Sequence, residues 1–223
     1  GNGIVGGEHG LADGSTRHVP TTEGTIELWF RPNWSSRELV FRDGQLLQRD
    51  FLRAGAINFY YRYGQGPVRD NLYSYVDLLT RGKLGAPGRE TDGLIGGHAR
   101  HFMQKAEWVH LAATWQLQQG KRGTEGSFAV FVNGEKMEPT WNYPRSLTGR
   151  DPYRLQEVAA RIVLGACDGC LDELRVSRVR RYEGDFTPSR QPFAPDAQTA
   201  ALFHFDGSLN GLSGAEGAVI AAQ

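Results

Sequence analysis

Short strand-like segments recur along almost the whole chain, and residues that favour turns separate them. Apolar and polar residues alternate within several of these segments, which is typical of a strand with one buried face, and long helical periodicity is scarce. Gly accounts for 29 of the 223 residues, against a usual share of roughly 7%, and this excess indicates many turns. The pattern predicts an all-β protein.

We expect strands at residues 24–32, 38–41, 46–47, 56–63, 73–79, 108–115, 128–132, 161–164, 171–177 and 199–205. Asn133 and Gly134 follow one of these segments and predict a type I′ hairpin turn, since both residue types accept positive φ. The segments 161–164 and 171–177 are expected to pair with each other. So many short strands in one domain imply a two-sheet sandwich or a jelly roll.

Two segments interrupt this rhythm and are expected to be long loops. They cover residues 64–107, apart from the expected strand within them, and residues 139–157. Long loops in compact domains often carry function. Because no internal repeat, low-complexity tract or linker occurs, the whole of residues 1–223 is interpreted as a single domain.

The overall charge excludes some classes of partner. The chain has 25 Lys and Arg residues and 25 Asp and Glu residues, so its formal net charge is zero. This balance argues against a nucleic-acid-binding domain, which usually needs a basic excess. Only four of the basic residues are lysines, and the basic run at 174–182 is either a solvated strand face or a polyanion patch. No apolar run approaches the roughly 20 residues of a membrane helix, so no membrane insertion is expected.

Five motifs in order resemble the laminin-G-like group of the concanavalin A-like lectin/glucanase superfamily. They lie at residues 24–32 (GTIELWFRP), 108–115 (WVHLAATW), 131–135 (FVNGE), 171–177 (LDELRVS) and 181–188 (RYEGDFTP). With the last expected strand they span about residues 24–205. The resemblance implies two antiparallel sheets packed face to face as a jelly-roll sandwich. That fold serves lectins, adhesion modules, glycoside hydrolases and polysaccharide lyases, so it does not determine function.

From the resemblance we expect a noncatalytic recognition module that binds carbohydrate. The chain begins Gly1-Asn2-Gly3, which is interpreted as the start of a domain excised from a larger secreted, periplasmic or cell-surface protein. Its ligand would be a sugar, including an acidic polysaccharide, and its other partners would be sibling domains of the parent. Asp172-Glu173 is expected to be structural, because the matching pair in laminin-G-like domains lies in a structural strand.

Aromatic and basic residues of one strand and the two long loops are the expected ligand-binding set. Asn58, Tyr60 and Arg62 alternate along one strand and therefore share a face. Aromatic rings stack on sugars, and arginines pair with acidic groups. The full set is Asn58, Tyr60, Arg62, Tyr73, Tyr75, His98, His101, Trp141 and Tyr143. Trp29, Trp108 and Trp115 are expected to serve in packing.

Two alternatives remain open. A polysaccharide lyase acting by β-elimination needs a group that neutralises a uronate and a Tyr or His that moves protons, and Tyr60, Arg62, His98 and His101 could supply these. The domain could instead pack against a sibling domain of an enzyme, and this predicts an exposed apolar patch. A glycoside hydrolase is not favoured, because no run of acids at strand spacing occurs.

The resemblance also implies one structural Ca²⁺, held by hard oxygen ligands. We expect Asp43 and Asp206 to be ligands of this ion, with Asp92 and Asp168 as alternatives. Cys167 and Cys170 are the only cysteines, and four-cysteine zinc sites need a second pair. We expect them to form a disulfide in a hairpin turn, with two free thiols as the alternative.

Overall fold

The computed structural model of the chain describes residues 4–5, 9–11, 20, 22–36, 48–54, 57–65, 72–84, 91–120, 123–137, 154–155, 162–164, 168–214 and 218–220. Side chains are described at residues 20, 22–36, 51–52, 59–61, 101–116, 129–137, 164 and 168–214. The regular elements within these ranges are all β-strands. Among the same residues there is no helix whose length and apolar character would let it cross a membrane.

The bounds of the strands follow. They are β1 Ile4–Val5, β2 His9–Leu11, β3 Glu23–Pro32, β4 Gln48–Ala54, β5 Ile57–Gln65, β6 Leu72–Leu84, β7 Thr91–Arg100, β8 Val109–Gly120, β9 Gly123–Val132, β10 Glu135–Lys136, β11 Arg154–Leu155, β12 Ile162–Leu164, β13 Gly169–Ser177, β14 Thr199–Phe203, β15 Gly211–Ser213 and β16 Ala218–Ile220. The expectation of an all-β protein is therefore confirmed for the described residues.

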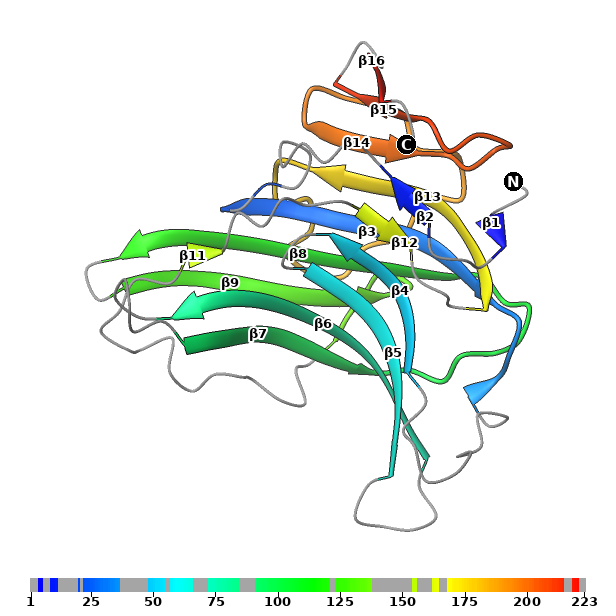
Figure 1. The fold of residues 1–223 in the computed structure, drawn as a ribbon, viewed down its shortest axis with the longest axis horizontal. Helices are drawn as coiled ribbons and strands as arrows, with labels where there is room; N and C mark the ends of the chain where they lie inside the picture. The colour runs from blue at the N-terminus through cyan, green and yellow to red at the C-terminus, as the bar shows by residue number, and fades with distance from the viewer. Residues whose placement is uncertain are drawn as a thin grey trace.

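In the described part of the chain these strands form two antiparallel sheets (Figure 1). Sheet A has nine strands in the order β10-β9-β8-β3-β13-β14-β15-β16, with β1 also paired to β13. Sheet B has seven strands in the order β11-β6-β5-β4-β12-β2, with β7 also paired to β6. Some neighbours are consecutive in sequence, as in β4-β5-β6, whereas β3 pairs with β8 and β13, which lie far from it along the chain.

Strand β3 lies near the middle of sheet A, between β8 and β13, and both of its faces are buried. Ile26, Leu28 and Phe30 alternate along one face and belong to the main apolar core. Glu27 and Trp29 lie between them on the opposite face. A strand that carries a fully buried Glu on one face requires a cover on that face as well as a core on the other.

One apolar core joins the two sheets. Sheet A contributes its inner-face residues, and sheet B contributes Phe51, Leu52, Phe59 and Tyr61 from β4 and β5. The rings of Phe30 and Phe51 meet at 4.4 Å between centroids, across the space between the sheets. This shared core makes the arrangement sandwich-like.

Residues 178–198, here called the covering segment, run over the outer face of sheet A. Their aromatic rings pack against a second apolar cluster around Ala112 and Phe131, which includes Tyr182 and Phe186. The Tyr182 and Phe186 rings stack with centroids 3.5 Å apart. The segment is fixed at the backbone as well, because Phe186 N–H donates to the Gly134 carbonyl at 2.9 Å.

Most of the expected strands are present. Those at 24–32, 56–63, 73–79, 108–115, 128–132, 161–164, 171–177 and 199–205 correspond to β3, β5, β6, β8, β9, β12, β13 and β14. The turn between β9 and β10 is confirmed, with φ of 53° at Asn133 and 82° at Gly134. The segments expected at 38–41 and 46–47, with the turn between them, lie outside the described residues.

Two expectations about connections are wrong. β12 and β13 do not pair: β12 lies in sheet B against β4 and β2, and β13 lies in sheet A against β3 and β14. The chain therefore crosses between the sheets at this point. The segment 64–107 is also not a long loop, because β6 and β7 pair along most of it. The many Gly and Arg residues of this segment do not suggest strands, yet it contains two paired antiparallel strands.

Candidate functional site

A cavity of about 240 Å³ lies beside the outer face of sheet A. Its lining combines two indoles, three carboxylates and the polar end of the covering segment. The lining residues are Trp29, Trp108, Asp172, Glu173, Arg190, Gln191, Pro192 and Asp206. The cavity thus gathers aromatic and ionisable groups in one place.

Five separate parts of the chain bring these residues together, one of them being the covering segment with residues 190–192. Trp29 comes from β3 and Trp108 immediately precedes β8, while Asp206 follows β14. Asp172 and Glu173 come from an irregularity in β13, where the register against β3 shifts and Glu173 has a φ of 51°. Such a bulge turns consecutive side chains away from strict alternation. It therefore allows two neighbouring carboxylates to line the same cavity.

Each of the two indoles carries an arginine. The Arg31 guanidinium lies 5.1 Å from the centre of the Trp108 ring, and that of Arg190 lies 4.9 Å from the Trp29 ring. These distances are those of cation–π contacts, in which the electron-rich ring face attracts the cation. Trp29 is 8% exposed, whereas Trp108 retains a partly exposed ring. The two indoles are thus pre-positioned, and Trp108 is the more accessible of them.

The carboxylates of the cavity differ in role. Glu173 accepts the Phe193 N–H at 2.7 Å with Oε2, and its Oε1 lies 2.7 Å from His204 Nδ1. It therefore anchors the covering segment to β13. The pKa of Asp172 is raised, first by burial and then by the negative charges of Glu173 and Asp206. Asp172 also accepts the Glu173 N–H at 3.0 Å.

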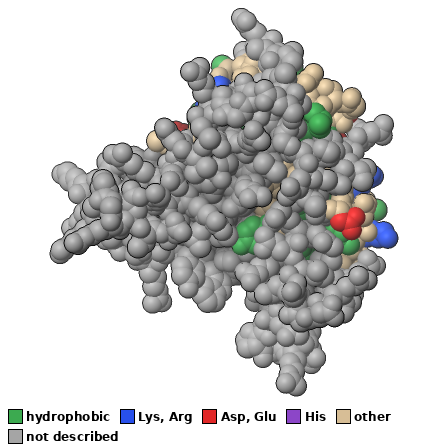
Figure 2. Space-filling view, in the orientation of Figure 1, with side chains coloured by type: hydrophobic (Ala, Val, Ile, Leu, Met, Phe, Trp, Pro, Cys, Tyr) green, Lys and Arg blue, Asp and Glu red, His purple; other side chains and the backbone are tan. Residues whose placement is uncertain are grey.

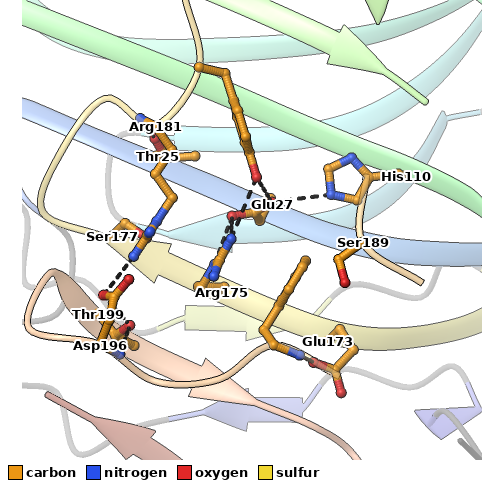
Figure 3. Close-up of polar contacts among 12 residues, drawn as sticks. Thr25, Glu27, His110, Glu173, Arg175, Ser177, Arg181, Ser189, Asp196 and Thr199 are labelled. Carbon is orange, nitrogen blue, oxygen red and sulfur yellow. Dashed lines mark hydrogen bonds and ion pairs between the residues drawn. The ribbon is translucent and has the colours of Figure 1, made fainter. Parts of the chain in front are cut away.

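Beneath the covering segment lies a buried network centred on Glu27 (Figure 3). Arg175 reaches Glu27 Oε1 with Nε at 2.8 Å and Nη2 at 2.7 Å. Tyr182 Oη donates to Glu27 Oε2 at 2.8 Å, and His110 Nε2 lies 3.2 Å from the same oxygen. Because His110 Nδ1 has no partner among the described residues, the tautomer with a proton on Nε2 fits this geometry.

The pKa values within this network follow from burial and charge. Burial alone would raise the pKa of the Glu27 carboxyl, but the hydrogen bond with His110 and the Arg175 charge outweigh it and lower the pKa below its usual value. Burial and the Glu27 charge raise the pKa of Tyr182 well above the ordinary range. Glu27 is therefore an ionised carboxylate with complete hydrogen bonding, and its role is structural.

The basic run at 174–182 is also occupied internally. Arg175 binds Glu27, Arg178 Nη1 donates to the Thr199 carbonyl at 2.7 Å, and Arg181 pairs with Asp196 at 2.8 Å. Three of the four arginines of this run therefore make contacts within the protein, which weakens the polyanion-patch interpretation. On the face drawn in Figure 2, described acidic and basic side chains lie beside one another at the right-hand edge.

On sheet B, the pairing register aligns four of the nine expected ligand-binding residues in two neighbouring rows. Tyr60 of β5 lies opposite Asp77 of β6, which lies opposite His98 of β7. The next row joins Arg62, Tyr75 and Arg100 in the same way. Residues directly opposite each other, and those two apart along a strand, share a face. The register thus brings together residues that are up to about 40 positions apart in sequence.

The remaining predicted residues are distributed as follows. Asn58 occupies β5 two positions before Tyr60, and Tyr73 occupies β6 two positions before Tyr75. Tyr60 is only 7% exposed, so its ring does not lie open to solvent. Trp141 and Tyr143 lie outside the described residues.

His101 directly follows β7, in the connection that leads to β8. Burial lowers its pKa, and the nearby charge of Glu135 in β10 opposes this effect. His98 is likewise a strand residue of β7. The expectation that His98 belongs to a long loop is therefore wrong, because it lies in a strand of sheet B, whereas His101 lies in the connection after that strand.

The metal and cysteine predictions are only partly covered by the described residues. Asp206 is exposed and lines the cavity, but no group of three or more His, Cys, Asp or Glu residues suited to a metal occurs among the described residues. Asp43 lies outside them. Cys170 is a buried thiol whose Sγ lies 3.5 Å from Arg31 Nη2. Its expected partner Cys167 is also outside the described residues, so thiol titration is the test of this pair.

Several residues have roles that their sequence pattern did not indicate. Trp115 is fully buried, as expected for packing, but Trp29 and Trp108 line the cavity. Glu27, flanked by core residues in β3, was not singled out. An acidic residue within a strand that is otherwise apolar on both sides could have indicated a buried charge, but only tertiary structure identifies its partners.

No known family model matches this chain, and no curated protein is significantly similar to it. The resemblance to laminin-G-like domains therefore rests on the five sequence motifs alone and stays a prediction.

Proposed function

We propose that this chain is a noncatalytic carbohydrate-recognition module with a laminin-G-like jelly-roll sandwich of the concanavalin A-like type. Two antiparallel sheets around one shared core support this fold, together with the order of the five motifs. We place the module outside the cytoplasm, as part of a larger secreted, periplasmic or surface protein. Its ligand on sheet B is a carbohydrate with acidic groups.

The register of sheet B carries this proposal. The two rows on β5, β6 and β7 place Arg62 and Arg100 on either side of Tyr75, whereas Tyr60 in the neighbouring row is buried. Arginine pairs with a carboxylate or sulfate through parallel N–H donors, and an aromatic ring supports the apolar face of a sugar. Adjacent strands lie about 4.8 Å apart, so three strands span a distance comparable with two or three sugar units.

Binding to acidic polysaccharides tests this proposal. We expect alginate, polygalacturonate or hyaluronate oligomers to bind, and the Arg62→Ala and Tyr75→Ala variants to bind at least about tenfold more weakly, because a lost charge-assisted hydrogen bond is worth about 1.5–3 kcal/mol. Arg180→Ala, on the covering segment of sheet A, is the matched control and should bind normally. Titrations with Ca²⁺ and with a chelator determine whether a calcium ion contributes.

Equal binding by Arg62→Ala and the parent chain would remove the support for a site on sheet B. A complete lack of binding to any acidic or neutral glycan, combined with tight binding to another protein, would overturn the carbohydrate proposal.

One observation favours a polysaccharide lyase as the second candidate. The register places Tyr60 and His98 on either side of Asp77, with Arg62 in the neighbouring row. A Tyr or His can remove the proton next to a uronate carboxylate and return one to the leaving oxygen, while Arg neutralises that carboxylate. The unsaturated product absorbs ultraviolet light. If activity is present and unchanged in both Tyr60→Phe and His98→Ala, these residues are not its proton carriers.

A protein-docking role without sugar binding predicts an exposed apolar patch. Phe102, at 53% exposure, is the single large hydrophobic residue that is exposed among the described side chains. One isolated ring is ordinary for a protein surface. No observation on the described surface therefore favours this third alternative.

A further inference from the structure

The cavity on sheet A is separate from the residues of the proposed site. It is built from β3, Trp108 before β8, β13, the covering segment and Asp206 beyond β14, whereas the two rows described above belong to sheet B. Its lining joins two indoles to hydrogen-bonding groups of both kinds. Asp172 and Asp206 offer acceptors, and Arg190 and Gln191 offer donors.

The size of the cavity limits what it can hold. Pockets for drug-sized ligands begin at roughly 300 Å³, and this cavity has a volume of about 240 Å³. It is therefore suited to a ligand of about one ring or to the terminal unit of a chain.

The charges around the cavity favour a ligand without net charge. A cationic ligand would be attracted by the carboxylates but repelled by the guanidinium groups of Arg31 and Arg190, which lie over the two indoles. An anionic ligand would meet Asp172, Asp206 and Glu173 within one small space, and like charges at such range repel strongly. A neutral ligand that both donates and accepts hydrogen bonds meets neither penalty.

We propose that this cavity binds a neutral sugar unit, with the Trp108 ring against its apolar face, Asp172 accepting from its hydroxyl groups and Arg190 donating to them. A pyranose has C–H groups on one face and hydroxyl groups around its edge, which matches an indole next to carboxylate and guanidinium groups. The inference goes beyond the proposed function, since it adds a second site of different ligand charge on the other sheet.

A panel of neutral methyl glycosides tests the inference. Methyl glycosides of glucose, galactose, mannose and N-acetylglucosamine are titrated against the full chain, with tryptophan fluorescence and indole N–H resonances as readouts. We expect saturable binding of at least one of them. Asp172→Asn and Arg190→Ala should each weaken it about tenfold or more, and Trp108→Leu should abolish it.

Matched controls separate this site from sheet B and from general unfolding. Asp185→Asn changes an exposed acid of the covering segment outside the cavity, and Arg62→Ala changes sheet B; both should bind the neutral glycoside normally. Arg190 is exposed, so its Ala variant should fold even if Trp108→Leu does not. Thermal unfolding of each variant verifies this.

Three outcomes would overturn the inference: no saturable binding to any glycoside of the panel, binding unaffected by Asp172→Asn and Arg190→Ala, or binding lost in Arg62→Ala alone. The last outcome would leave the proposed function intact while removing the second site. Conversely, loss of acidic-glycan binding with normal glycoside binding would overturn only the proposal for sheet B.

Discussion

Both faces of sheet A are buried around β3, yet they are built from opposite chemistry. On the inner face Ile26, Leu28 and Phe30 are at most 1% exposed and pack in an apolar core. On the outer face Glu27 and His110 are 0% exposed and form a polar network. The inner face is covered by a second sheet, whereas the outer face is covered by a single irregular segment.

This difference shows what burial costs on each face. An apolar side chain gains roughly 1.5–3 kcal/mol from leaving water. A buried ion pair gains little over apolar residues of the same shape, but it becomes strongly unfavourable when one partner is lost. The stability of the outer face therefore depends on every buried charge keeping its partner, and the stability of the inner face depends on close packing without cavities.

The largest expected effect comes from breaking the central ion pair. Arg175→Met leaves the ionised Glu27 buried without its main counter-charge, and we expect this to lower the free energy of unfolding by about 3–5 kcal/mol. Chemical denaturation measures it. The matched change on the inner face is Leu28→Ala, with an expected loss of about 2–5 kcal/mol from the cavity that it creates.

The double variant sharpens this comparison. Glu27→Gln combined with Arg175→Met removes both charges, and we expect it to be more stable than Arg175→Met alone. On the inner face no second truncation should restore stability. If the double variant is as unstable as the sum of its single changes, the outer network is not an ion pair in the energetic sense.

A smaller effect is expected where the covering segment meets the β9–β10 turn. A Cβ at Gly134, where φ is 82°, would overlap the Phe186 carbonyl oxygen. Gly207 has a similar φ of 81° and nothing within 4 Å, so Gly207→Ala reports backbone strain alone, about 1–2 kcal/mol. We expect Gly134→Ala to cost more and to speed hydrogen exchange at the Phe186 N–H. If the two substitutions lower the free energy of unfolding equally, the covering segment moves away from residue 134 without loss of stability.

The smallest effect concerns pH. The folded-state pKa of Glu27 is lower than its unfolded value, so its contribution to stability is present above the unfolded pKa, near 4, and is lost as pH falls through the folded pKa. Asp196 acts in the same sense through its hydrogen bond from Arg181. Asp172 acts in the opposite sense, since its pKa is raised and protonation favours the folded state.

We therefore expect the melting temperature to fall below about pH 4 and to fall less steeply in the Glu27→Gln/Arg175→Met variant. Thermal scans from neutral to acid pH give both slopes, with Asp185→Asn as the control that should follow the parent chain. Identical slopes in all three proteins would show that the outer face does not set the acid stability.

Much of the strand pattern could be predicted from the sequence, because alternation and turn residues are local properties. The β3 and β8 segments and the turn at Asn133 and Gly134 are examples. The pairing of strands is a different matter, since β12 and β13 are near neighbours in sequence but lie in different sheets. Nothing local distinguishes a hairpin from a crossing between sheets.

The candidate sites show the same division. The alternation of Asn58, Tyr60 and Arg62 along one strand was evident from their spacing, and the register then added Tyr75 and His98 beside them. The cavity on sheet A could not be foreseen, because Trp29, Asp172 and Arg190 come from three separate segments. Only the bulge in β13 and the path of the covering segment bring them to one place.

The sequence by itself thus determined the class of structure: many short strands, frequent turns and a balanced charge. Only the tertiary structure decided which face of each strand is buried and by what. The physical reason is that local sequence does not determine what covers each of the two faces of a strand. The carboxylate of Glu27 can be buried only because Arg175, His110 and Tyr182, from distant parts of the chain, form hydrogen bonds or ion pairs with it.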